Sequence, residues 1–295
     1  MTPKWEAPKL GVRWTIGDAS SAGRQALRLS ILGAWGIFGS DAAYVVCVNS
    51  CDVETMRRSL GELPDEVAWI QVAGMNPRFL PFCDKSLSEG TSWKFSPVRC
   101  FPDRYELALD NDCILWRCPP AVRAWLARPA EVLLAADVIP ANGVFHDLTG
   151  PVALNSGIRR FPARFDYEGQ LIDMLRTSGR ILRRELDEQG LQIATLTRSG
   201  HCHTVPLDEV TICSPFPPHV SHLGSCGAHF VGLNVRHLPW EFHGRPALEC
   251  RLEHWQTLLP EVERRVAEAV QAMEAGSTMV PLNLAGASLT PKLVA

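Results

Sequence analysis

The sequence has no long apolar run, no basic cluster and no Cys-x-x-Cys pair, and each absence counts against a class of protein. Charged residues interrupt every apolar stretch before it reaches the roughly 18 residues of a membrane-spanning helix. The formal net charge is −3 and no lysine- or arginine-rich run stands out, so a nucleic-acid-binding surface is not expected. Without a Cys-x-x-Cys pair, a structural zinc site has no obvious anchor.

The start of the chain also lacks the apolar core of a signal peptide, so we expect a cytoplasmic protein without a membrane span. Its ten cysteines are expected to be mostly reduced and buried, because disulfide frameworks belong to short secreted chains. Hydrophobic residues make up 46% of the 295 positions and charged residues 21%, which is ordinary globular composition. The length suits one large α/β domain or two small ones.

Strand-like and helix-like apolar patterns alternate along the first quarter of the chain. Near-continuous β-branched runs predict buried strands, and apolar spacing of three to four residues predicts helices. The pattern predicts strands at 12–16, 43–49 and 67–74, with helices at 24–38 and at 52–60, the second capped by Asp52. Strands that alternate with helices are typical of a parallel sheet with right-handed crossovers.

The remaining chain predicts further strands and helices of the same domain. We expect strands at 105–109, at 131–139 and within 207–216, a strand and turn at 150–160, helices at 121–129 and 255–275, and a mostly helical stretch at 168–189. Residues 1–11 are predicted to form an N-terminal arm, 12–275 one α/β domain, and 276–295 a C-terminal tail. No internal repeat or low-complexity segment is present.

Two carboxylates, Asp110 and Asp112, stand directly after the predicted strand 105–109. In open α/β sheets ligands bind outside the carboxyl ends of strands, so this is where a site is expected. In a continuing strand both side chains would point to the same face, and two like charges so close need a cation or water. Carboxylate oxygens suit Mg²⁺ or Mn²⁺. The alternative is a solvated turn, for which Asp-Asn-Asp is also suited.

A histidine could complete a metal site with these carboxylates. His229 lies in a Gly- and His-rich stretch near the end of the predicted domain, and His222 is a rival for the same role. His219, His222 and Cys226 also leave a structural zinc site open. The sequence alone does not decide which of the three histidines would bind a metal.

Further features accompany the doublet in a fixed order. They are Thr15 and Asp18 in the first loop with Leu27-Arg-Leu-Ser30 in the following helix, Lys94, the doublet itself, Leu154-Asn155-Ser156-Gly157, Asp187-Glu188-Gln189-Gly190, and His229-Phe-Val-Gly232 followed by Arg236 and Pro239-Trp240. This ordered set, which spans roughly residues 12–240, resembles that of the metal-dependent GT-A glycosyltransferases, most closely glycosyltransferase family 8, the galactosyltransferase and glycogenin group.

The resemblance implies a GT-A-like, Rossmann-like domain with a mostly parallel sheet and helices on both faces. It implies transfer of a sugar, with retention of configuration, from a nucleotide-sugar, most simply a UDP-sugar, to an unidentified carbohydrate or other hydroxyl-bearing acceptor. Mn²⁺ or Mg²⁺ would be bound by Asp110, Asp112 and His229. The donor would contact Thr15, Asp18, Lys94, Asp110, Asn111, Asn155, Gly157, Gly232 and Arg236.

At the reacting sugar the resemblance implies catalytic positions for Asp187, Glu188 and Gln189. Either Asp187 or Glu188 would bind a hydroxyl of the donor sugar, and Gln189 would lie beneath its anomeric carbon. Without the resemblance, the same residues fit an exposed helix C-terminus that stops at Gly190.

Two departures from the family pattern keep other functions open. The family's nucleobase-stacking tyrosine has no counterpart between Asp18 and Gly23, and the lysine of its Lys-Pro-Trp motif is absent, with Arg236 the nearest basic residue. A non-catalytic relative that binds a nucleotide-sugar and a nucleotidyltransferase-like enzyme therefore remain as alternatives.

Overall fold

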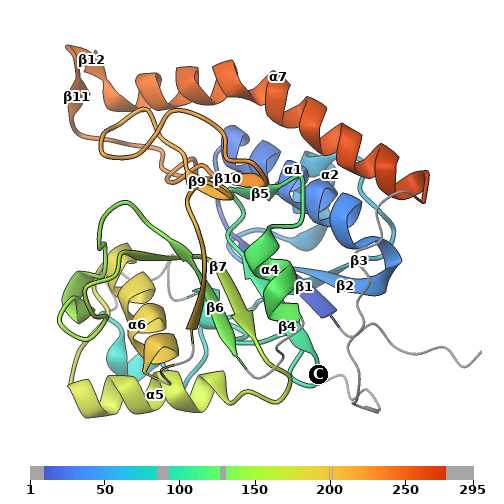
Figure 1. Cartoon of the computed structure of the whole chain (residues 1–295). Helices are drawn as coiled ribbons and strands as arrows, with labels where there is room; N and C mark the ends of the chain where they lie inside the picture. The colour runs from blue at the N-terminus through green and yellow to red at the C-terminus, as the bar shows by residue number, and fades with distance from the viewer. Residues whose placement is uncertain (1–9, 85–92, 127–130, 199, 201, 277–295) are drawn as a thin grey trace, which may run out of the picture.

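The computed structural model describes residues 10–84, 93–126, 131–198, 200 and 202–276. A seven-stranded sheet in the order β3-β2-β1-β4-β7-β6-β8 forms its centre (Figure 1). Its strands are β1 Leu10–Ile16, β2 Ala42–Val48, β3 Val67–Gln71, β4 Tyr105–Leu109, β6 Val132–Ala136, β7 Leu154–Phe161 and β8 Cys202–Val205. Within this sheet β7 runs antiparallel to both of its neighbours, and the other pairs are parallel.

Helices cover both faces of the sheet. They are α1 Ser21–Phe38, α2 Val53–Leu60 and α4 Pro120–Leu126 on one face, α5 Tyr167–Ser178 and α6 Glu185–Thr197 on the other, and α7 Ala247–Glu274, which packs along α1. A small sheet joins β5 Cys113–Leu115, β10 Gly227–His229 and β9 Val210–Ile212, and β11 Glu241–Phe242 pairs with β12 Arg245–Pro246. Short 3₁₀ turns are η1 Gly39–Asp41, η2 Leu80–Phe82, η3 Trp93–Phe95 and η4 Gly143–Phe145.

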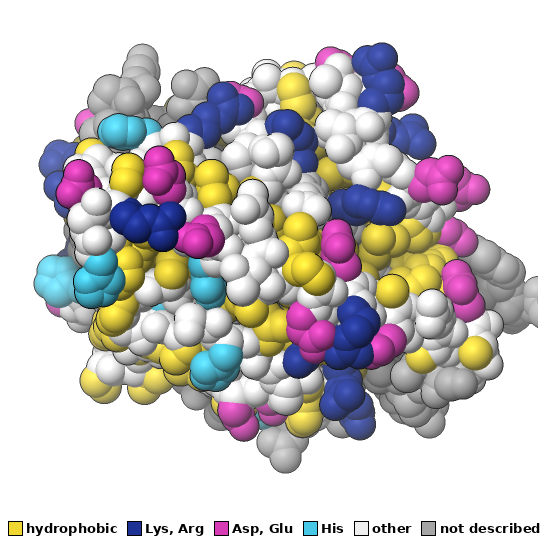
Figure 2. Space-filling view, turned by 90° about the horizontal axis from the view of Figure 1, so that it is seen from above, with side chains coloured by type: hydrophobic (Ala, Val, Ile, Leu, Met, Phe, Trp, Pro, Cys, Tyr) yellow, Lys and Arg dark blue, Asp and Glu magenta, His cyan; other side chains and the backbone are white. Residues whose placement is uncertain are grey.

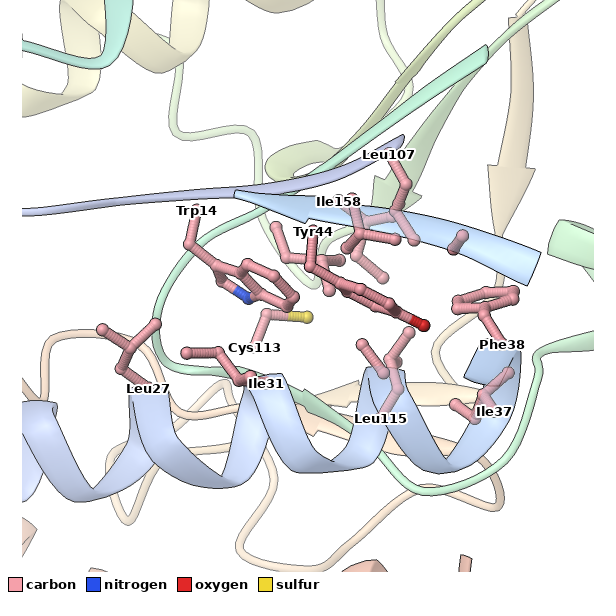
Figure 3. Packing of buried hydrophobic residues seen from close by; sticks show 14 of the residues in the cluster. Trp14, Leu27, Ile31, Ile37, Phe38, Tyr44, Leu107, Cys113, Leu115 and Ile158 are labelled. Carbon is pink, nitrogen blue, oxygen red and sulfur yellow. The ribbon is translucent and has the colours of Figure 1, made fainter. Parts of the chain in front are cut away.

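The core between the sheet and α1 is built on two aromatic side chains, Trp14 and Tyr44 (Figure 3). Their rings stack with centroids 6.4 Å apart, and both side chains are almost fully buried. Each polar end has a partner, because Trp14 Nε1 donates to Ser30 Oγ at 2.8 Å and Tyr44 Oη donates to Gly39 O at 2.7 Å. The large rings therefore bury their area without leaving a donor unpaired.

Two glycines let α1 approach its neighbours closely. A Cβ at Gly33 would lie 1.9 Å from Leu115 O of β5, and one at Gly36 would lie 2.7 Å from Ala269 C of α7. Ser20 caps the helix and accepts from Gly23 N at 3.0 Å. This packing fixes β5, and with it the turn that carries the Asp110–Asp112 doublet, against the first helix.

The fold class expected from the sequence is confirmed: the domain is mixed α/β, with a mostly parallel sheet and helices on both faces. Asp52 caps α2 as predicted. The stretch 168–189, expected to be mostly helical, contains two helices, because Gly179 takes a left-handed conformation (φ 65°) and ends α5 before α6 begins. The last helix begins at Ala247, ahead of the predicted 255, and contains Pro260.

The predicted arm and tail lie mostly outside the described residues. Leu10 and Gly11, placed in the arm, belong to β1, and Gly276 is the one described residue of the tail. In the described ranges no helix is both long enough and apolar enough to cross a membrane.

Candidate active site

Asp110, Asn111 and Asp112 form a turn between the central sheet and the small sheet. Cys113 N donates to Asp110 O at 3.0 Å, and Asp110 N donates to Gly157 O at 2.8 Å. The carboxylates follow β4 as predicted. They do not lie on one face of a continuing strand, because the chain turns after Leu109 and enters β5 at Cys113. The solvated-turn alternative is also wrong, since Asp112 is only 5% exposed.

Strand pairing brings His229 to the doublet. In the antiparallel pair of β5 and β10, His229 stands opposite Cys113, and Phe230 N donates to Asp112 O at 2.9 Å. His229 Nε2 consequently lies 3.2 Å from Asp112 Oδ1. One ligand atom each from Asp110, Asp112 and His229 lies within 4.8 Å of the others. Residue spacing alone could not predict this strand pairing, because β5 and β10 are far apart along the chain.

The described residues contain no second group of three or more potential metal ligands. His219, His222 and Cys226 therefore do not gather into the zinc site that the sequence left open, and His229 is the histidine beside the carboxylates. The ring nitrogens of His219 and His222 instead lie near the backbone carbonyls of Phe216 and Leu223.

The donor set of this cluster fits a divalent cation. Two carboxylates and an imidazole suit Mn²⁺, and the oxygens alone suit Mg²⁺. His229 Nδ1 is buried and has no hydrogen-bond partner among the described residues. This ring nitrogen is therefore not occupied by another protein group. Burial lowers the pKa of His229, but the hydrogen bond and charge of Asp112 outweigh it and leave that pKa above its usual value.

Lys94 of η3 joins the doublet to α6. Its Nζ lies 3.0 Å from Asp110 Oδ2 and 3.3 Å from Glu188 Oε2. Burial by itself would lower the pKa of Lys94, but the two carboxylates raise it above its usual value. Burial raises the pKa of Glu188, and Lys94 only partly opposes this. Lys94 is therefore a fixed cation between two elements of the site.

Arg159 of β7 is a site residue that the sequence reading missed. Its side chain is 4% exposed, and Nη1 lies 2.9 Å from Asp110 Oδ1 and donates to Ser156 O. Burial would raise the pKa of Asp110, but Lys94 and Arg159 together hold it below its usual range. The sequence feature that could have pointed to Arg159 is the pair of arginines, Arg159 and Arg160, inside an otherwise apolar strand. Strand alternation turns Arg160 away, onto the ring of Trp125 at 3.6 Å.

Asn155 and Gly157 lie in β7, not in a free turn. Asn155 Nδ2 donates to Asp137 Oδ2 at 2.8 Å, and its Oδ1 accepts from Gly157 N at 2.7 Å. A Cβ on Gly157 would lie 2.3 Å from His229 Cε1, so this position has no room for a side chain. Gly157 therefore presents its backbone directly to the imidazole of the candidate metal centre.

Glu188 and Gln189 lie in the first turns of α6, where Glu188 is buried and Gln189 is half-buried. Glu188 accepts from Gln192 Nε2, whose own Oε1 accepts from Tyr167 Oη at 3.0 Å, so the carboxylate is held toward Lys94. Gln189 Nε2 donates to Ala141 O at 2.8 Å, and its Oε1 accepts from Ser156 N at 3.3 Å. Gln189 thus ties α6 to the start of β7.

Asp187 anchors the beginning of α6. Its Oδ2 accepts from Arg183 N and Arg184 N at 2.8 and 2.9 Å, and its Oδ1 accepts from Val144 N at 2.9 Å. The exposed helix C-terminus considered for this stretch is wrong, because α6 continues past Gly190. This glycine instead admits Asn142 O, which would lie 2.0 Å from a Cβ.

The other predicted donor residues lie around the first loop and the loop after β10. Thr15 is at the end of β1, opposite Cys47 of β2. Asp18 forms an ion pair with Arg236, and both side chains are more than half exposed. This pair is separate from the contacts that join Lys94, Asp110 and Glu188.

Asn111 connects the doublet to that loop. Its amide exchanges hydrogen bonds with Asn234, at 3.1 and 2.8 Å, and donates to Gly23 O at 3.2 Å. Gly232 has a positive φ of 77°, and its carbonyl accepts from Arg251 Nη1 at 2.9 Å. The doublet, the start of α1 and the loop after β10 are thereby joined.

Solved glycosyltransferases share this architecture. The galactosyltransferase LgtC, in a complex with donor and acceptor sugar analogs, matches with a TM-score of 0.52 and 13% identity, over 84% of this chain and 95% of that one. The bifunctional glycosyltransferase WbbM, in its apo form, matches with a TM-score of 0.50 and 13% identity, over 90% of this chain and 53% of that one. At such low identity the match establishes the fold, which is GT-A-like.

No protein-family model and no curated protein matches the sequence.

Proposed function

We propose that this protein is a metal-dependent glycosyltransferase that transfers a hexosyl group from a nucleotide-sugar, a UDP-sugar in the simplest case, to a hydroxyl of an acceptor. The observation that carries the proposal is the meeting of Asp110, Asp112 and His229 beside the cation Lys94, on a fold shared with glycosyltransferases. The family 8 motif order and the LgtC complex with sugar analogs support the same reaction class.

The three clustered residues would hold Mn²⁺ or Mg²⁺. Such an ion, when bound, supplies positive charge where a diphosphate leaving group gains negative charge. Lys94 and Arg159 provide two further fixed cations at the same place. We assign these two side chains to the donor diphosphate, because both already hold the carboxylate of Asp110 and are close enough to share their charge with a neighbouring anion.

In the proposed transfer the bond between the anomeric carbon and the phosphate oxygen breaks, and a bond from that carbon to the acceptor oxygen forms. The acceptor proton passes to the released phosphate, so that no separate base is required. We assign Glu188 to a hydroxyl of the donor sugar, because its carboxylate is buried and aimed at Lys94. Asp187, whose oxygens accept from three backbone amides, is assigned to anchoring α6.

Asn155 and the backbone of Gly157 are assigned to the donor side of the same site. Gln189 beneath the anomeric carbon, retention of configuration, and donor contacts of Thr15, Asp18, Asn111, Gly232 and Arg236 stay predictions from the family resemblance. Among them, the Asp18–Arg236 pair is the most exposed.

The test is a panel of nucleotide-sugars incubated with the purified protein, with Mn²⁺, with Mg²⁺ and with chelator. We expect slow hydrolysis of one donor and a melting shift that both require the metal. Asp112→Asn should abolish both. Binding of a nucleotide-sugar that is unaffected by Asp112→Asn, without turnover, would instead support the non-catalytic alternative. No response to any donor would contradict the proposal.

A further inference from the structure

Two cysteine sulfurs face each other on the side of the sheet opposite α1. Cys47 of β2 alternates with Val46 and Val48, which pack in the core on the α1 side, so its side chain points to the other face. Cys100 lies in the loop before β4, and the two Sγ atoms are 3.4 Å apart. Neither cysteine is in a disulfide bond. Two thiols that meet at this distance can close an S–S bond of about 2.05 Å with a small movement.

The backbone on both sides of this cysteine pair is fixed. Cys100 N and Phe101 N donate to Glu106 Oε2 at 3.0 and 2.7 Å. The preceding residue, Arg99, donates from its guanidinium to four backbone carbonyls. Cys47 lies in a strand that has a neighbour on each side, because β2 is between β1 and β3. The two sulfurs are therefore held together by the fold.

Charge is concentrated around the cysteine pair, unlike on the molecular surface. Acidic and basic side chains are mixed over the face in Figure 2. By contrast, the buried guanidinium of Arg13 interacts electrostatically with both Cys47 and Cys100. The hydrogen bond between the two sulfurs lowers the pKa of Cys47, and the charge of Arg13 acts in the same direction, against the effect of burial. Because the thiolate is the reactive form of cysteine, this environment favours reaction of the pair.

The two sulfurs differ in their access to solvent. Cys100 is half-buried, whereas Cys47 is fully buried. A small uncharged oxidant therefore meets Cys100 first, and Cys47 is placed to react with the oxidised product. This division between an accessible cysteine and an adjacent resolving cysteine is typical of redox-sensitive pairs.

We propose that Cys47 and Cys100 are a redox modification site, at which hydrogen peroxide closes a reversible disulfide bond. The Cys100 sulfur attacks one peroxide oxygen and becomes a sulfenic acid, while the O–O bond breaks and the thiol proton leaves with the released water. The Cys47 sulfur then displaces the sulfenic hydroxyl, which takes the Cys47 proton and leaves as a second water. The two thiols lose two electrons in total, and a dithiol reductant restores them by exchange.

Closing this bond acts on the candidate site through Arg13. Nη1 of Arg13 donates to Pro97 O and Val98 O at 2.8 Å, and Nη2 donates to Lys94 O at 2.9 Å. Because Cys100 follows this segment, a movement of its sulfur toward β2 displaces the segment that carries Lys94 into the candidate site. Oxidation therefore lowers the affinity for the donor. This consequence rests on the proposed function, whereas the modification itself does not.

Mass spectrometry of the full chain, reduced and then exposed to hydrogen peroxide, tests the modification. The remaining thiols are alkylated after denaturation, and the crosslinked peptides are mapped. We expect a Cys47–Cys100 crosslink that lowers the mass by two hydrogens and that dithiothreitol reverses. Cys100→Ser and Cys47→Ala should each abolish it. Oxidation of the unchanged protein without this crosslink, or with a different one in its place, would overturn the proposal.

The matched control is Cys51→Ser, which removes another half-buried cysteine near β2 and should form the crosslink at an unchanged rate. Circular dichroism of each variant checks that it is folded. Oxidation should raise the KM for the donor about threefold or more in the unchanged protein and in Cys51→Ser, but not in Cys100→Ser. A crosslinked protein with an unchanged KM would overturn the effect on the donor site. A protein that forms the crosslink but turns over no donor in either state would contradict the proposed function and still support the modification site.

Discussion

Two charged clusters lie at the two ends of β4, and they are built differently. At its start, Glu106 is fully buried between Arg13 and Arg99, at 3.7 and 3.5 Å. Just past its end, Asp110 lies between Lys94 and Arg159, at 3.0 and 2.9 Å. Both clusters join one carboxylate to two cations. Only the second is partly open, with the Lys94 side chain 26% exposed.

The partners of the cations distinguish the two clusters. Arg13 donates to the carbonyls of Lys94, Pro97 and Val98 at 2.8 to 2.9 Å, and Arg99 donates to four other backbone carbonyls. Backbone groups therefore bind the terminal guanidinium nitrogens of both arginines, whereas Arg13 Nε, Arg99 Nε and Glu106 Oε1 have no hydrogen-bond partner among the described residues. In the second cluster, Lys94 is paired with carboxylate side chains, which can exchange partners when an anion binds. The charges of Arg13 and Arg99 are therefore expected to stabilise the fold, whereas the charge of Lys94 is expected to be available to a ligand.

The largest expected effect is at the open end of β4. Asp112→Asn removes one of the clustered carboxylates while keeping its shape, so metal-dependent donor hydrolysis should fall about 10³-fold or more. The melting temperature without metal should change little, and the metal-dependent melting shift should disappear. Asp103→Asn, which removes an exposed carboxylate 3.8 Å from Arg164, is the control and should keep full activity. If the activity of Asp112→Asn stays within tenfold of that of the unchanged protein, the cluster past the end of β4 does not hold the metal that catalysis requires.

The closed end should respond in stability. Glu106→Gln leaves Arg13 and Arg99 buried without a counter-charge, which should cost about 3–5 kcal/mol of unfolding free energy in urea titrations. Glu261→Gln removes a carboxylate from an exposed pair on α7 and should lower the unfolding free energy far less, because solvent screens that pair. Equal losses in the two variants would mean that burial does not distinguish them.

The sequence predicted the open end of β4 better than the closed one. The apolar run of β4 and the acids after it were visible, because strand periodicity and turn chemistry are local. That Glu106 is a buried charge was not visible, because its two partners come from β1 and from the loop before β4. Arg159 was missed for the same reason: a strand pattern does not show which long-range partner each face meets.

The convergence of His229 with the doublet could not be derived from spacing. It depends on the register of β10 against β5, which is set by the whole small sheet. The ordered motifs of a known family supplied this residue where local physics could not. The break between α5 and α6 is a local feature by contrast, since Gly179 is a stop signal inside the stretch that was expected to be mostly helical.

A smaller effect is expected at Gly157, which lies behind the metal cluster. Gly157→Ala would place a Cβ 2.3 Å from the ring of His229 and must move that imidazole. Because supporting contacts of a ligand typically change metal affinity 10- to 100-fold, the Mn²⁺ concentration for half-maximal activity should rise about that much. Gly74→Ala, at a position with open space, is the control. Unchanged metal affinity would show that His229 does not contribute to the site.

The smallest effect tests whether the two clusters communicate. Arg13→Lys and Arg99→Lys each remove a guanidinium fork next to Glu106, so both should lower the unfolding free energy by similar amounts. Only Arg13 also holds Lys94, through a hydrogen bond of 2.9 Å to its backbone carbonyl. Arg13→Lys should therefore raise the KM for the donor about threefold to tenfold through a misplaced Lys94, whereas Arg99→Lys should leave it unchanged. Steady-state hydrolysis at a temperature where both variants are folded measures this, and equal KM values would show that the closed cluster supports the fold without positioning the donor site.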